Sequence, residues 1–181
     1  HFVPVDGLPG GFYEAACQRL SAGGVCQYEI SNSARAGKES RHNLKYWTRQ
    51  PYLGFGVDAH SMLYGPGTTG EAARFSTPDS LEEYVAGAPL KRIPVSKTAA
   101  LEETFFLGLR LSEGVDLERV ATDFGESVVL GLTETISECV DLGLLECEGD
   151  VIRLSGRGRL LSNEVFERFI LCGSDTAVRR R

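Results

Sequence analysis

The residues best suited to chemistry lie in one stretch of the chain, residues 28–61. It holds two of the three histidines, His42 and His60, and the single tryptophan, Trp47. An imidazole can coordinate iron, and Trp47 and its neighbour Tyr46 offer flat apolar faces on which a planar cofactor can lie. The run HNLKYW therefore favours His42 as an axial ligand of, or a contact to, a planar cofactor. A packing or hydrogen-bonding histidine is the alternative.

The segment around His42 is more basic than the rest of the chain, whose formal net charge is −6. Its charged residues are Arg35, Lys38, Arg41, Lys45 and Arg49, against the single Glu39. Guanidinium and ammonium groups pair with carboxylates, so this excess can hold acidic side chains of a cofactor. A solvated loop is the alternative.

His60 is expected just after a buried strand over Tyr52–Val57. The carboxyl ends of strands face the ligand in parallel α/β folds, which favours a ligand near His60. A core histidine with satisfied hydrogen bonds is the alternative, and Asp58 is interpreted as an ordinary strand-end carboxylate. Gly54 and Gly56 within the strand predict the close approach of a ligand or of another backbone.

The elements before this stretch follow an α/β pattern. A helix is predicted over residues 8–23, with apolar residues at helical spacing. These are Phe12, Ala16 and Leu20. Alternation over residues 26–30 predicts a strand with one buried face, and Glu29 lies on its polar face. Helix, glycine turn and strand make half of a βαβ unit. The segment 31–50 shows no periodicity and is interpreted as a loop.

The second part of the chain is typical of a small winged-helix-like domain. Residues 87–97 hold two prolines and little pattern, so a linker is placed there. Apolar spacing then predicts three helices, a hairpin that turns at Gly149-Asp150, and a last helix. The helices centre on 101–109, 117–124, 129–140 and 158–171, and the hairpin pairs 144–148 with 151–154. The candidate recognition helix, 127–142, has acidic residues but no Arg or Lys, which argues against DNA contacts.

Composition excludes several classes of protein. The length of 181 residues suits one large or two small domains, and the 42% of apolar residues suffices for a core. The negative net charge argues against a general nucleic-acid binder, and no membrane-length apolar run or signal peptide is present. Five scattered cysteines without a CxxC or CxxxCxxC motif predict free thiols in a reducing cytosol and no cluster or zinc site in this chain. A first residue other than Met suggests an internal piece of something longer.

The run YEISNSARAGKESRHNLKYW, followed by YLGFGVDAHS, resembles the C-terminal half of the HemW-like radical SAM proteins. These are haem chaperones, also described as oxygen-independent coproporphyrinogen III oxidase-like. The HNxxYW motif at residues 42–47 is that family's signature. The runs LGLRLSEGVDL and RGRLLSNEVFERF resemble its C-terminal domain, so the resemblance covers about Phe12 to Phe169. This chain departs from the family pattern at Asp58, where family members usually have glycine or a small residue.

The resemblance implies an α/β fold, the last units of a partial (β/α) radical SAM barrel followed by a small helical winged-helix-like C-terminal domain. The implied divisions are barrel units in 1–86, a linker in 87–97, a HemN-type C-terminal domain in 98–171 and a tail in 172–181. The family's 4Fe-4S cluster motif and most of its S-adenosylmethionine (SAM) site are expected upstream of His1. No catalytic residue or metal ligand is therefore expected here, and this chain alone should not perform radical chemistry. Ala59 and His60 are expected near SAM.

The resemblance implies first a haem chaperone that delivers haem to respiratory apoproteins. The haem-binding candidates are His42, Asn43, Tyr46, Trp47, Arg41 and Lys45. The alternative is an enzyme, an oxygen-independent coproporphyrinogen III dehydrogenase, in which the basic residues hold substrate carboxylates. A non-catalytic interaction module is the third reading. Haem or a porphyrin is the expected ligand, respiratory haem apoproteins are the expected partners, and a homodimer is left open. No nucleic-acid partner is expected, and the expected location is the cytoplasm.

Overall fold

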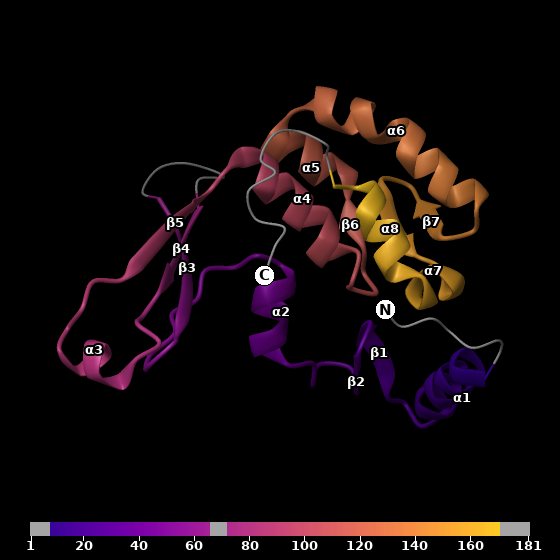
Figure 1. The fold of residues 1–181 in the computed structure, drawn as a ribbon. Coiled ribbons are helices and arrows are strands. Elements are labelled where there is room, and N and C mark those ends of the chain that lie inside the picture. The colour runs from indigo at the N-terminus through magenta and orange to yellow at the C-terminus, as the bar shows by residue number, and fades with distance from the viewer. Residues whose placement is uncertain (1–7, 66–71, 171–181) are drawn as a thin grey trace.

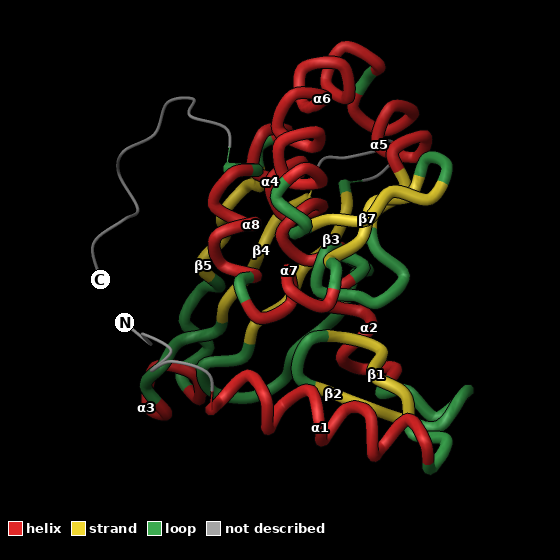
Figure 2. Tube along the Cα trace, turned by 90° about the vertical axis from the view of Figure 1, so that its right-hand side faces the viewer, coloured by secondary structure: helices red, strands yellow, loops and turns green. Residues whose placement is uncertain are grey.

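The computed structural model describes residues 8–65 and 72–170. The first elements are one long helix and a short antiparallel hairpin, followed by the helix that carries HNLKYW. Their bounds are α1 (Leu8–Ala22), β1 (Cys26–Glu29), β2 (Asn32–Ala34) and α2 (Arg41–Trp47). Figure 2 shows α1 lying along the hairpin, at the end of the molecule opposite α6.

A three-stranded antiparallel sheet follows, in the order β3-β4-β5. Its elements are β3 (His60–Tyr64), β4 (Ala72–Ser76), the short helix α3 (Leu81–Val85) and β5 (Lys91–Val95). Met62 on β3 pairs with Arg74 on β4, which pairs with Ile93 on β5, so these three side chains share one face. The buried Met62 packs on that face with the residues that begin α4, and Figure 1 shows α2 between this sheet and the hairpin.

Residues 97–170 form a helical domain with a small sheet, β6-β8-β7. Its elements are α4 (Lys97–Gly108), β6 (Val115–Asp116), α5 (Leu117–Phe124), α6 (Glu126–Asp141), β7 (Leu145–Glu148), β8 (Val151–Leu154), α7 (Gly156–Leu160) and α8 (Ser162–Arg168). One continuous apolar core joins α4, α5, α6 and α8 to the sheet. At its centre Phe105 stacks on Phe169, with ring centroids 4.8 Å apart. None of the helices in the described ranges is long and apolar enough to cross a membrane.

Most predicted helices and the wing hairpin are confirmed. The helix 8–23 is α1, the three helices after residue 97 are α4 to α6, and the hairpin is β7 with β8. Gly149 begins the hairpin turn at a φ of 59°, as its place in the sequence predicts. The last predicted helix is broken at Leu161 into α7 and α8. The third strand of this sheet, β6, was not predicted.

The predicted strand over Tyr52–Val57 is wrong. Tyr52 forms a single antiparallel bridge to Met62, and the rest is loop. Phe55 is 87% exposed, so the run is not buried on two faces. Gly54 explains the backbone path, because a Cβ there would lie 2.3 Å from the carbonyl oxygen of His60. That close approach of another backbone is what the glycine predicted.

Three further predictions differ from the structure. The predicted apolar stripe of α1 is exposed, with Phe12 at 73% and Leu20 at 45%. The segment 31–50, interpreted as a loop, contains β2 and α2. The segment 87–97, interpreted as a linker, contains β5, which pairs with β4 along its whole length. A domain boundary near this point stays a prediction. The expectations for the start of the chain, the tail 172–181 and the fifth cysteine, Cys172, lie outside the described residues.

Candidate functional site

Helix α2 carries all six haem-binding candidates. Ser40 begins it, since the Ser40 hydroxyl accepts a hydrogen bond from the backbone N–H of Asn43 at 3.3 Å. A seven-residue helix is not stable by itself, so its contacts with the rest of the chain must hold it. Its exposed residues are Arg41, His42 and Lys45, and its half-buried candidates are Asn43, Tyr46 and Trp47. The helix therefore divides the candidates into an outer basic face with an imidazole and an inner, mainly aromatic face.

A row of aromatic rings runs from the outer face of α2 towards the β3–β5 sheet. His42 meets Tyr46 edge to face, with ring centroids 5.0 Å apart and an interplanar angle of 86°. Tyr46 in turn meets Tyr52 at 4.5 Å and 61°. Burial is the largest cause that raises the pKa of Tyr52, and the nearby Tyr46 raises it further. The Tyr52 phenol therefore stays protonated at neutral pH and keeps its O–H donor.

Trp47 attaches α2 to the C-terminal domain. The guanidinium of Arg110 lies over the Trp47 ring, with its carbon 4.5 Å from the ring centroid. Arg110 Nη2 is also 3.7 Å from Oε2 of Glu29, whose side chain is fully buried. The other Glu29 oxygen accepts hydrogen bonds from the backbone N–H of Ser31 at 3.0 Å and from the side chain of Asn32 at 2.5 Å. Glu29, predicted on the polar face of its strand, is instead buried, and these contacts give it a structural role.

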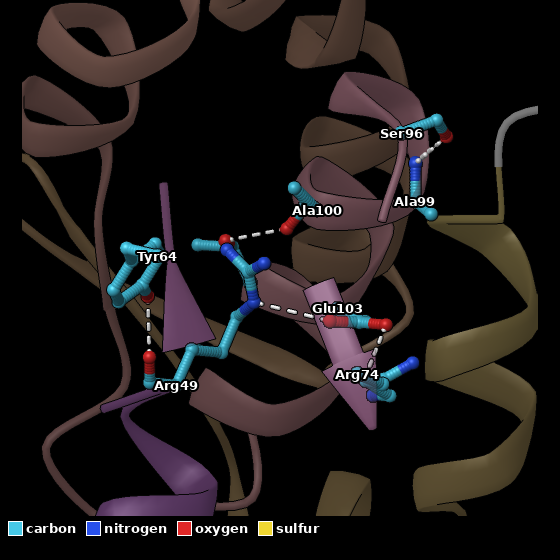
Figure 3. Close-up of polar contacts among 8 residues, drawn as sticks. Arg49, Tyr64, Arg74, Ser96, Ala99, Ala100 and Glu103 are labelled. Carbon is cyan, nitrogen blue, oxygen red and sulfur yellow. Dashed lines mark hydrogen bonds and ion pairs between the residues drawn. The ribbon is translucent and has the colours of Figure 1, made fainter. Parts of the chain in front are cut away.

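A second polar link holds the end of α2 against α4 (Figure 3). Arg49 Nε donates to Oε2 of Glu103 at 3.1 Å, and Arg74 Nη2 donates to Oε1 of the same carboxylate at 2.6 Å. The Tyr64 hydroxyl donates to the carbonyl oxygen of Arg49. Arg49 adopts a φ of 53°, the left-handed conformation that lets the chain turn back towards the sheet. One carboxylate on α4 therefore positions two arginines from segments far apart in the sequence.

Two hollows lie next to these contacts. The α2–β4 hollow, of about 390 Å³, has an apolar and aromatic lining made of Tyr46, Trp47, Tyr52, Met62 and Leu107. Its polar lining residues are Asn43, Arg49, Arg74 and Glu103. The α4–α5 hollow, of about 710 Å³, shares Trp47 and Arg49, and its other charged residues are Arg119, Glu113, Asp116 and Asp123. Both volumes fall in the usual range for small-molecule sites.

The two SAM-proximal candidates lie elsewhere. His60 begins β3 and its side chain is 66% exposed, with Nε2 3.7 Å from Oδ1 of Asp58. His60 therefore does not follow a buried strand, as the sequence predicts, because β3 starts at His60. The backbone N–H of Ala59 donates to the Thr77 hydroxyl at 2.8 Å. Neither residue lines the two hollows, and their nearness to SAM stays a prediction.

The described residues offer no ready metal site. In residues 8–65 and 72–170, no three His, Cys, Asp or Glu side chains gather to hold a metal ion. The four described cysteines, Cys17, Cys26, Cys139 and Cys147, are free thiols. These residues do not fit an iron–sulfur cluster, which needs several cysteine thiolates close together.

Sequence reasoning missed the residues that support α2 from other elements. Arg74, Glu103 and Arg110 come from β4, from α4 and from the turn after α4. Each stands in a segment that reads as ordinary strand or helix, and no local pattern connects them to HNLKYW. Only the fold brings them together.

Comparison with known proteins now defines the class. The sequence family described as the HemN C-terminal domain matches residues 95–161. The coproporphyrinogen III oxidase HemN of Escherichia coli, described as a radical SAM enzyme, has a similar fold with a TM-score of 0.65. It is 16% identical, and the match covers 93% of this chain and 42% of that one. The chain therefore has the mixed α/β fold of the C-terminal part of that class.

Sequence relatives narrow this class to a family. The haem chaperone HemW of Bacillus subtilis is 36% identical over 169 residues, which cover 93% of this chain and 44% of the relative. HemW of Lactococcus lactis is 33% identical, with the same coverage of each chain. A mitochondrial radical S-adenosyl methionine domain-containing protein 1 of Danio rerio is 30% identical, over 93% of this chain and 40% of its own. The chain belongs to the HemW-like, coproporphyrinogen III oxidase-like family and spans less than half the length of these relatives.

Proposed function

We propose that this chain is the haem-binding C-terminal part of a haem chaperone of the HemW type, which delivers haem to respiratory apoproteins. One observation carries the proposal: α2 presents the imidazole of His42 on the surface, beside the ring of Tyr46. An exposed imidazole at the edge of an aromatic row suits axial coordination of haem iron. In the whole protein, SAM and a 4Fe-4S cluster belong to the radical SAM part of the family.

The surroundings of His42 support this role. Arg41 and Lys45 are exposed on the same short helix, where they can pair with haem propionates. The half-buried Trp47 fixes the helix through Arg110, so the imidazole is presented on a supported element. A cytoplasmic location is part of the proposal, since the free thiols fit a reducing compartment.

Sequence likeness favours the chaperone over the coproporphyrinogen III dehydrogenase. The HemW proteins of Bacillus and Lactococcus are 33–36% identical to this chain. The coproporphyrinogen III oxidase of Escherichia coli is 16% identical, a likeness that shows the fold alone. The chaperone is therefore the function proposed here.

Hemin titration of the 181-residue chain, followed by the Soret band, tests the proposal. We expect His42→Ala to lose the spectrum of imidazole-ligated iron and to weaken hemin binding by about tenfold or more. His60→Ala is the matched control, because His60 is also an exposed histidine, and it should leave the titration unchanged. Equal affinity and equal spectra for wild type and His42→Ala would remove His42 as a ligand. A wild-type chain that does not bind hemin would overturn the proposed function.

A further inference from the structure

We propose that the α2–β4 hollow binds the carboxylate of a planar aromatic ligand, and that Arg74 is the residue that receives it. The inference rests on the proposed function for the natural ligand, a porphyrin, whose propionates are such carboxylates. Arg74 lies on β4, outside the HNxxYW motif.

The lining of the hollow favours a flat aromatic ligand. Tyr46, Trp47 and Tyr52 contribute aromatic rings, and Met62 and Leu107 contribute apolar side chains. Aromatic rings favour offset-stacked or edge-to-face contacts with another ring. Few of the described lining residues carry polar groups that can meet a ligand. The position of these groups therefore determines where a charged group of the ligand can bind.

The charge of the hollow selects an anion. Arg49 and Arg74 face the single carboxylate of Glu103, which leaves one net positive charge. Arg49 is 11% exposed and is held at Nε by Glu103. Arg74 is 46% exposed and uses Nη2 for the same partner, so its other nitrogens can still donate to a ligand. A guanidinium with one edge occupied and one edge at the surface is suited to a second carboxylate.

The neighbouring hollow has the opposite charge. Arg49 and Arg119 line it together with Glu113, Asp116 and Asp123, so the charged lining residues sum to one net negative charge. The net negative charge of the α4–α5 hollow repels a carboxylate, and the net positive charge of the α2–β4 hollow attracts it. Although the α4–α5 hollow is larger, the smaller hollow is therefore the one that fits an acidic ligand.

The test uses 2-naphthoate and its neutral analogue 2-naphthamide as probes. Trp47 is the single tryptophan and lines the hollow, so its one indole N–H signal in a ¹H–¹⁵N spectrum reports binding without any haem. We expect naphthoate to shift this signal in a saturable way and to bind about tenfold more tightly than naphthamide. Arg74→Gln should abolish that preference. Arg119→Gln, which removes an exposed arginine from the other hollow, should retain it.

The outcomes separate this inference from the proposed function. An indole signal that naphthoate does not move, equal affinities for the two probes, or an unchanged preference in Arg74→Gln would each overturn the carboxylate site. None of these results depends on hemin, whose binding is judged by the His42 titration. Glu103 keeps Arg49 as a partner in Arg74→Gln, and an unchanged spectrum outside the hollow will verify that the variant is folded.

Discussion

Different interactions stabilise the region before α4 and the C-terminal domain that begins with α4. The C-terminal domain buries its apolar side chains in one core that includes residues from α4, α5, α6, α8 and the small sheet. The region before it has a small buried cluster around Met62 and exposes large apolar residues such as Phe12 and Phe55. What positions α2 is a set of polar and aromatic links to the C-terminal domain, chiefly Trp47–Arg110–Glu29 and Arg49–Glu103. The candidate site thus lies in the region before α4, which has only a small buried cluster. Its geometry depends on contacts with the C-terminal domain, which has the large apolar core.

The largest effect is expected in the core of the C-terminal domain. Phe105 is 1% exposed and stacks on Phe169, so Phe105→Ala removes a ring from a site that cannot collapse easily. We expect a loss of about 3–5 kcal/mol in the free energy of unfolding, measured with urea. Its neighbour Phe106 is 42% exposed and provides the matched control, with an expected loss of about 1 kcal/mol. Equal losses would show that the apolar core does not dominate this domain.

A smaller loss is expected where the two regions meet. Arg110→Met leaves the buried Glu29 carboxylate without its cation and removes the group stacked on Trp47. We expect about 3 kcal/mol of destabilisation, together with a change in Trp47 fluorescence. Arg119→Met is the control, since Arg119 is 80% exposed in its pair with Asp123 and should change stability by less than about 1 kcal/mol.

A double variant sharpens the second prediction. If the cost of Arg110→Met is the unpaired carboxylate, adding Glu29→Gln should recover part of the stability, because a neutral amide is less costly to bury. If the double variant is no more stable than Arg110→Met, the loss of stability comes from the missing contact between Arg110 and the Trp47 ring. In either case, a hemin or naphthoate affinity that stays at the wild-type value would show that α2 keeps its place without Arg110.

The same contrast explains how much the sequence could predict. The helices and wing of the C-terminal domain follow from local signals, such as apolar spacing through α4 and the glycine turn at Gly149. Helix α2 gives no such signal, because it is seven residues long and buries none of its residues fully. The apolar run 52–57 predicts a strand only if its side chains are buried, and the fold leaves Phe55 exposed. The roles of Arg74 and Arg110 depend on contacts between distant segments, which no local pattern contains.

The smallest change in the free energy of unfolding is expected in the loop before β3, in the region before α4. Asp58 has a φ of 53°, a conformation that glycine adopts without steric cost and other residues adopt at a cost. Asp58→Gly should therefore raise the free energy of unfolding, by about 0.5 kcal/mol after the greater chain entropy of glycine is allowed for. Asp58→Ala keeps the strain and should lower it by a similar amount.

The ion pair with His60 offers a second explanation of any change at Asp58, and a control excludes it. The two side chains are 66% and 68% exposed and 3.7 Å apart, so the pair should contribute little. His60→Ala is therefore expected to leave urea unfolding unchanged, while Asp58→Gly still stabilises the chain. If the two variants shift the unfolding midpoint by the same amount, the side-chain pair and not the backbone conformation determines stability at this loop.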